Sequence, residues 1–293
     1  MSHRLPAPAG RWIDRTQPLT FDFNGRAYRG FRGDTLASAL LAQDVRLLGR
    51  SFKLHRPRGV WSCGIEEPNA IVDVGAGSRR TPNARATLVP LAEGLSAQSV
   101  NCWPSVGFDL GALTGAFGAL LPAGFYYKTF KWPSWRWFEP AIRRMAGLGV
   151  APDRPDADHY EEVAAEADVL VVGGGLAGLA AAAAAAREGA QTVLLSGAAR
   201  LGGALGWRAD PEVERLAQAV RAAGVRILTR TLAFGVYDHN LVCAVESLSG
   251  EGRNLPACVL RERLWKIRAR STQAGRFRPS PLRLSTAHTR LWS

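Results

Sequence analysis

Cysteine is scarce in this sequence, and no two cysteines stand at the short spacing of a metal or redox motif. The 293 residues include four, Cys63, Cys102, Cys243 and Cys258. A zinc ribbon, a CxxC motif or a ferredoxin cluster needs cysteines only a few residues apart. A disulfide scaffold and a cysteine-ligated metal site are therefore excluded as organising principles, and no metal ligands are expected. This cysteine usage favours a reducing compartment, so we expect a cytoplasmic protein.

Long apolar segments are also lacking. The first ten residues contain no apolar core of a secretory signal. Residues 110–127 are uncharged and nearly long enough for a membrane span. Glycine and proline weaken any helix there, at Gly111, Gly115, Gly118, Pro122 and Gly124. We therefore expect a connector and no membrane association.

The composition is that of a globular protein of about two domains, with 47% hydrophobic and 21% charged residues. Its net charge of +12 is uneven, because nine basic residues and one acidic residue lie between Arg261 and Ser293. The aromatic and groove-reading patterns of dedicated nucleic-acid modules are missing. We expect no nucleic-acid partner.

The first part of the chain predicts a small α+β module. Residues 19–23 alternate, Asn24-Gly25 predicts a type I′ turn, and residues 26–31 form the second arm of a hairpin. Asp34 can cap a following helix. Further strands are expected over residues 70–74 and 85–89.

Residues 96–166 predict a connector rich in aromatic residues, glycine and proline. Long irregular segments are uncommon in compact domains unless they bind something or pack across a surface. The aromatic side chains either dock between modules or on a partner, or pack only within this chain. The sequence leaves both alternatives open.

From Asp168 onward the pattern changes to βαβαβ. A buried strand over residues 168–172 leads into Gly173-Gly174-Gly175-Leu176-Ala177-Gly178 and an alanine-rich helix. A strand, a helix and a third strand follow over residues 191–195, 211–223 and 225–229. In a dinucleotide site, Gly173 allows the turn, Gly175 lets a pyrophosphate approach the backbone, and Gly178 lets the helix pack on the strand.

Cofactor-binding residues can be predicted from this loop, whereas no catalytic residue can. An acidic residue normally binds the ribose at the end of the second strand, and Ser196 stands there, with Arg200 close enough in sequence to favour a 2′-phosphate. His239 beside Asp238 is more typical of a structural histidine than of an acid–base catalyst. The predicted cofactor-binding residues are Gly173, Gly174, Gly175, Leu176, Ala177, Gly178, Ser196, Arg200, Gly202 and Gly203.

Several stretches resemble the alpha subunit of heterotetrameric sarcosine oxidase and its relatives, the large chains of opine and cyanide-forming oxidoreductases. They are residues 51–59 (SFKLHRPRG), 63–70 (CGIEEPNA), 125–130 (FYYKTF), the glycine loop, 201–203 and 237–240. The resemblance implies an α/β chain: a ferredoxin-like (β-grasp) module at 15–95, a connector at 96–166, and a Rossmann-type FAD/NAD(P)-binding domain with a β-meander at 167–270.

The resemblance also implies a function within a hetero-oligomer. Sarcosine is oxidised to glycine on a flavin-carrying beta subunit, smaller subunits complete the assembly, and the alpha-type chain binds NAD, with FAD as the alternative ligand of the same loop. On this interpretation the chain is an oxidoreductase subunit acting on CH–NH donors. Two other functions are considered: an independent FAD-dependent oxidoreductase and a non-catalytic interaction subunit.

Two departures from the family pattern modify these expectations. Cluster-binding relatives need four cysteines in the first module, and only Cys63 lies there, so no iron–sulfur cluster is expected. Residues 271–293 lack periodicity and the apolar strand that should follow, which predicts a disordered or out-of-frame tail and an incomplete, C-terminally truncated nucleotide domain. His55, Arg56 and Arg58 form either an anionic docking patch or a solvated loop.

Overall fold

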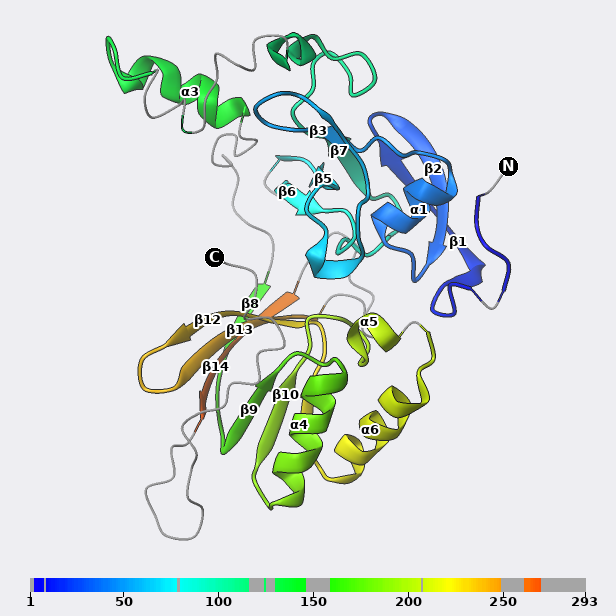
Figure 1. The fold of residues 1–293 in the computed structure, drawn as a ribbon, viewed down its shortest axis with the longest axis vertical. Coiled ribbons are helices and arrows are strands. Elements are labelled where there is room, and N and C mark those ends of the chain that lie inside the picture. The colour runs from blue at the N-terminus through cyan, green and yellow to red at the C-terminus, as the bar shows by residue number, and fades with distance from the viewer. Residues whose placement is uncertain are drawn as a thin grey trace. The chain divides into compact units, whose positions relative to one another are not determined.

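The computed structural model describes residues 3–7, 9–77, 80–115, 124, 130–145, 159–206, 208–248 and 261–269. The chain divides into two units, Met1–Asp156 and Ala157–Ser293. Figure 1 shows the elements of both units. The predicted tail at 271–293 lies outside the described residues.

A five-stranded sheet organises the first unit. Its order is β2 (Arg26–Arg32), β1 (Asp14–Phe23), β7 (Ser96–Ser99), β5 (Ile71–Val74) and β6 (Thr81–Arg85). The hairpin β1–β2 turns at Asn24 and Gly25, whose φ values of 56° and 77° are those of a type I′ turn. Strands β1 and β7 pair in parallel. Two short strands, β3 (Gly49–Arg50) and β4 (Pro57–Arg58), form a separate pair.

Helix α1 (Leu36–Ala42) packs its apolar residues into the core of this unit. Its N-cap is Thr35 and not the predicted Asp34, because the Thr35 hydroxyl accepts from the Ser38 amide in a capping box. Asp34 is buried and instead binds the Arg4 guanidinium and the Phe31 amide.

The strand expected at residues 85–89 is not present. Strand β6 ends at Arg85, and the next residues turn toward helix α1, where Ala86 and Val89 carbonyls accept from the Ala37 and Leu36 amides. Two amides of the first helical turn are thereby satisfied, which a continued strand could not do. Local β propensity is overridden by this tertiary requirement.

The segment expected to be irregular contains regular elements. They are β7, the 3-10 helix η3 (Leu110–Gly115), α3 (Trp135–Met145) and β8 (His159–Ala167), and another 3-10 helix, η1 (Gly64–Glu66), precedes them. Residues 125–129 of the family-like stretch are outside the described residues. Within the described ranges, no helix has the length and hydropathy of a membrane span.

The second unit contains a three-stranded parallel sheet in the order β11 (Arg226–Leu228), β10 (Thr192–Leu195) and β9 (Val169–Val172). Helices α4 (Leu176–Arg187) and α6 (Pro211–Ala222) connect its strands, and a short helix, α5 (Gly203–Gly206), lies between them in sequence. Side chains alternate across the sheet, so that Leu194 faces the helices while Val193 and Leu195 face away.

A second sheet covers the other face of the parallel strands, in the order β12 (Thr231–Tyr237), β13 (Leu241–Ser247), β14 (Arg261–Ala269) and β8. Trp265 and Ile267 of β14 pack with Leu170 and Leu195 of the parallel sheet. The unit therefore has three layers: helices, parallel sheet and β-meander (Figure 1). In the described part of the chain, β9 is an edge strand.

Strand β8 was assigned to the connector by sequence, and the structure corrects this. It pairs in parallel with β14 over nine residues, from His159 to Ala167. The sequence of β8 does alternate: Val163, Ala165 and Ala167 face the core, whereas Glu162 and Glu166 are exposed. Small alanines and several acids concealed this period-two pattern.

Candidate functional site

The glycine loop joins strand β9 to helix α4. Gly173 follows the strand with a φ of +113°, a conformation that disfavours a side chain, and its amide donates to the Leu195 carbonyl at 2.8 Å. The turn therefore starts at the carboxyl edge of the parallel sheet. It places the N-terminus of helix α4 at that edge, the position at which α/β sheets bind ligands.

Two glycines of the loop are required by packing within the chain itself. A Cβ on Gly178 would lie 1.8 Å from the Gly173 carbonyl oxygen. A Cβ on Gly174 would lie 2.7 Å from Ser196 Oγ. These contacts hold helix α4 close to β9 and the loop close to the end of β10.

A second glycine turn lies against the first. The Gly202 amide donates to the Gly174 carbonyl at 2.7 Å, and Gly175 forms an isolated parallel bridge with Gly202. A Cβ on Gly203 would approach Gly175 Cα at 3.2 Å. The structure thus brings Gly202 and Gly203 to the loop, although the residues lie nearly thirty positions away in sequence.

Gly175 differs from the other glycines of the loop because it combines open space with an ordinary φ, whereas Gly173 has open space but a positive φ. It is the N-cap of helix α4, it has a φ of −81°, and a Cβ built on it meets no atom within 4 Å. No side chain caps this helix, whereas Asp210 caps helix α6 through the Glu212 and Val213 amides. An uncapped helix N-terminus with open space in front of it is suited to an anion.

Ser196 lies at the end of β10, directly behind the glycine loop. The residue is 4% exposed. Its amide donates to the Leu228 carbonyl and its carbonyl accepts from the Thr231 amide, each at 2.8 Å. Arg200 is exposed in the following loop. Leu176 and Ala177, in the first turn of α4, are exposed as well.

One residue of this edge was missed by sequence. Arg230 follows β11, and its amide donates to the Ala198 carbonyl at 3.0 Å, beside the loop that carries Arg200. No motif marks this arginine, because its neighbourhood arises from the pairing of β10 with β11. Its φ of 52° shows a tight turn at this position.

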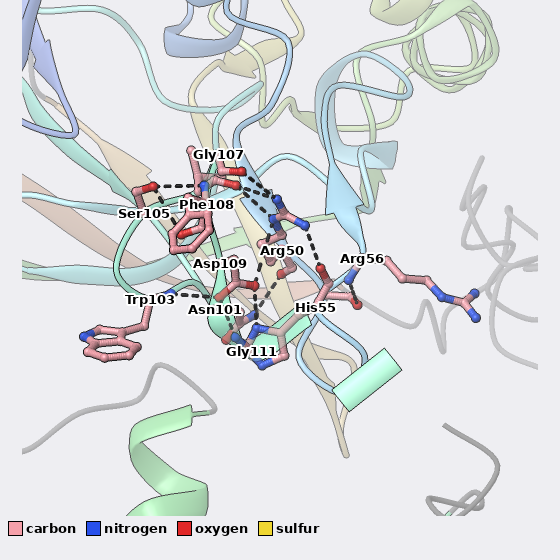
Figure 2. A network of polar contacts seen from close by, with 12 residues as sticks. Arg50, His55, Arg56, Asn101, Trp103, Ser105, Gly107, Phe108, Asp109 and Gly111 are labelled. Atoms are coloured by element: carbon pink, nitrogen blue, oxygen red, sulfur yellow. Dashed lines mark hydrogen bonds and ion pairs between the residues drawn. The ribbon is translucent and has the colours of Figure 1, made fainter. Parts of the chain in front are cut away.

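A buried polar network occupies the first unit (Figure 2). Asp109 Oδ2 contacts His55 Nδ1 at 2.8 Å, and Asp109 Oδ1 accepts from the Trp103 and Gly111 amides at 2.9 and 3.1 Å. The Arg50 guanidinium donates to the Val106 and His55 carbonyls.

Burial opposes ionisation of Asp109, but its hydrogen bonds prevail and lower the pKa of the carboxyl. The network fixes the loop that precedes η3, since a Cβ on Gly111 would collide with the His55 ring.

His55 and Arg58, two of the three residues considered as a docking patch for anions, make contacts within the chain. His55 binds Asp109, and Arg58 donates to the Asn69 side chain at 2.6 Å. The Arg56 side chain extends away from the network in Figure 2. This geometry fits the alternative of a structured surface loop.

Comparison with known proteins relates the chain to one class of oxidoreductase subunit. It is 48% identical over 278 residues to the sarcosine oxidase subunit alpha of Rhizobium meliloti (strain 1021), covering 91% of this chain and 28% of that protein. It is 36% identical to the same subunit of Corynebacterium sp. (strain P-1), covering 92% of this chain and 25% of that protein. The chain is a homologue of sarcosine oxidase alpha subunits. It spans about a quarter of the length of these relatives.

Two family models match separate parts of this sarcosine oxidase alpha homologue. Residues 16–102 match a 2Fe-2S iron-sulfur cluster binding domain, and residues 168–216 match an FAD dependent oxidoreductase. The second match contains the glycine loop and Ser196. A solved L-proline dehydrogenase from P. horikoshii aligns with a TM-score of 0.48 at 20% identity, covering 87% of this chain and 40% of that chain.

The match over residues 16–102 corrects the expectation of a chain without an iron–sulfur cluster, because this segment is of the cluster-binding domain type. The number of cysteines reports on cluster ligands, whereas the family match reports on the type of domain. The matched segment holds two cysteines, Cys63 and Cys102, whereas a [2Fe–2S] site is held by four thiolates.

The environment of these cysteines does not complete a ligand set. Burial raises the pKa of the Cys102 thiol, Asp109 adds to this, and Arg50 opposes it, whereas a cluster needs the thiolate. Among the described residues, no group of three or more His, Cys, Asp or Glu could hold a metal ion.

The glycine loop, in contrast, fits a dinucleotide. Its open space at Gly175, its uncapped helix and its second glycine turn leave backbone amides at one edge of the sheet. These are the features that bind a pyrophosphate. The donors that the glycine loop itself offers are backbone N–H groups.

Proposed function

We propose that this chain is the dinucleotide-binding part of an alpha-type sarcosine oxidase subunit. The glycine loop and the first turn of helix α4 hold the pyrophosphate of an FAD- or NAD(P)-type dinucleotide in a Rossmann-type site. A bound dinucleotide would supply hydride transfer, while the protein binds and orients it. Homology to sarcosine oxidase alpha subunits and the FAD-oxidoreductase match support this proposal.

Gly175 is the observation that carries the proposal. Gly173 is required by its backbone conformation, and Gly174 and Gly178 by close packing. Gly175 is required by neither, because its φ suits any residue and its missing side chain would enter open space. A ligand that approaches the backbone closely explains a glycine at this position.

The wider reaction follows from the relatives and is proposed on that basis. Within a hetero-oligomer, a beta-type flavoprotein subunit oxidises sarcosine to glycine, and this chain supplies dinucleotide binding. The relatives' name, sarcosine oxidase subunit alpha, supports an assembly of several subunits. We propose no general base in this chain. The cytoplasmic location stays a prediction.

The test compares two glycine variants of the full chain. Gly175→Ala should unfold at the wild-type temperature without ligand, because the new methyl group meets no atom, but should lose the rise in melting temperature produced by FAD, NAD or NADP. Ligand at about 100 times its dissociation constant should stabilise the wild type by about 2.7 kcal/mol.

Gly107→Ala is the matched control. Gly107 has equally open space but belongs to the first unit and not to the glycine loop. This variant should retain the full ligand-induced shift. Binding of all three dinucleotides by Gly175→Ala with wild-type affinity would show that the loop is not the pyrophosphate site.

A further inference from the structure

The end of strand β10 carries the chemistry that selects the ribose of a dinucleotide. In sites for an unphosphorylated ribose, Asp or Glu at this position accepts hydrogen bonds from the 2′-hydroxyl, and a nearby Arg instead accommodates a 2′-phosphate. Here the position is Ser196. No Asp or Glu occurs between Gly189 and Ala209, whereas two arginines do, Arg200 and Arg208.

Backbone pairing places a further arginine at the same edge. The Ser196 amide donates to the Leu228 carbonyl, the Thr231 amide to the Ser196 carbonyl, and the Arg230 amide to the Ala198 carbonyl, over 2.8 to 3.0 Å. The loop after β10 is thus joined to the turn after β11. Arg230, partly buried, and Arg200, exposed, flank this junction.

The loop that carries Arg200 is fixed to the pyrophosphate cradle at both ends. At one end Ser196 lies against Gly174, and at the other the Gly202 amide donates to the Gly174 carbonyl at 2.7 Å. A ribose attached to a pyrophosphate at Gly175 would therefore lie next to the loop that carries Arg200. A carboxylate there would repel a phosphate, and none is present in residues 189–209.

We propose that the ligand of this site is a 2′-phosphorylated dinucleotide of the NADP class, with Ser196, Arg200 and Arg230 as the specificity-determining residues. This rests on the proposed dinucleotide-binding function. Ser196 carries no negative charge that would repel a 2′-phosphate, unlike an Asp or Glu at this position. Guanidinium groups bind phosphate oxygens through charge-assisted hydrogen bonds, which are stronger than neutral ones.

Titration of the full chain with NADP, NAD, FAD and 2′,5′-ADP, followed by calorimetry and thermal shift, tests the proposal. NADP should bind at least tenfold more tightly than NAD, and 2′,5′-ADP should raise the melting temperature by itself. The preference should weaken as salt is raised, because it depends on charge. Tighter binding of NAD or FAD than of NADP would overturn the inference and leave the proposed function intact. Binding of none of the four would overturn the proposed function as well.

Single substitutions test which residues produce the preference for NADP over NAD. Arg200→Gln and Arg230→Gln should each weaken NADP binding about tenfold or more, with NAD binding unchanged, which is the size of one charge-assisted bond. Ser196→Asp should reverse the preference toward NAD.

Arg187→Gln is the matched control, because Arg187 is exposed at the opposite end of helix α4. It should leave the ratio of the two affinities unchanged. An equal loss of NAD and NADP binding in Arg200→Gln and Arg230→Gln would show that these residues do not read the 2′-phosphate.

Discussion

Glu67 provides a quantitative test of how the first unit is held together. Its side chain is buried, with 1% of its surface exposed. Its carboxylate accepts four backbone hydrogen bonds, from the amides of Trp61 (2.7 Å), Ser62 (2.6 Å), Asn69 (2.6 Å) and Ala70 (3.0 Å). One side chain thereby closes the loop between residues 61 and 70, inside the segment that matches the cluster-binding domain.

The informative substitution is Glu67→Gln. Glutamine keeps one acceptor oxygen and replaces the other by an amide NH₂, so two of the four backbone amides lose their acceptor. A hydrogen bond to a charged group contributes about 1.5 kcal/mol or more. The free energy of unfolding should therefore fall by about 3 kcal/mol at pH 7, measured by urea denaturation of the full chain.

The stabilisation by the Glu67 carboxylate depends on pH, and the direction of its pKa shift determines how. Burial acts to raise the pKa of Glu67, but the four backbone amides outweigh it and lower the pKa. A lowered folded-state pKa means that the carboxylate stabilises the protein fully above the unfolded-state value of about 4.3. The stabilisation is lost as the pH falls through the lower folded-state pKa. The difference between wild type and Glu67→Gln should therefore shrink in acid.

Glu66→Gln is the control, since Glu66 is the exposed neighbouring residue. It should change the free energy of unfolding by no more than about 0.5 kcal/mol. An equal loss in both variants, or a loss for Glu67→Gln that does not change between pH 7 and pH 3, would refute the hydrogen-bond account.

Other predictions concern packing in the second unit and two further buried polar groups of the first unit, Asp109 and Ser62. Gly178→Ala places a methyl group 1.8 Å from the Gly173 carbonyl oxygen. It should lower the free energy of unfolding by about 3 kcal/mol or more, measured as a lower melting temperature by circular dichroism. A melting temperature equal to that of the wild type would contradict the packing argument. Asp109→Asn should lower the free energy of unfolding by about 2 kcal/mol, because an amide replaces the carboxylate that contacts His55 Nδ1 and accepts from the Trp103 and Gly111 amides. The loss should shrink as the pH falls through the lowered pKa of Asp109. Ser62→Ala should be neutral or stabilising by about 1 kcal/mol, since Ser62 Oγ is buried without a partner; clear destabilisation would reveal a missing hydrogen bond.

The candidate site could be located from sequence because its signals are local. One short segment contains a buried apolar strand, a glycine turn and an alanine-rich helix. The positions of Gly173, Gly175 and Gly178 in the loop therefore follow from local sequence. Arg230 could not be found in this way. Its position beside Ala198 depends on hydrogen bonds between two strands that the sequence separates by helix α6.

The strands also divide into those predictable from local sequence and those that depend on distant partners. The hairpin of β1 and β2 was predictable because a two-residue turn and two alternating arms specify it locally. Strand β8 was not, because its partner β14 lies about a hundred residues away. The error at residues 85–89 has a similar origin, since their carbonyls bind amides of helix α1, fifty residues earlier.

The sequence by itself determined where the glycine turn stands, that a parallel strand leads into it, and that Ser196 stands where dinucleotide sites normally carry an acidic residue. Only the tertiary structure decided that Gly174 and Gly178 serve packing while Gly175 serves neither packing nor an unusual φ, and that the turn carrying Arg230 lies against the loop carrying Arg200. The reason is physical: turns and periodic faces are encoded within a few residues. Close approaches between distant segments depend on which strands pair, and no short stretch of sequence contains that information.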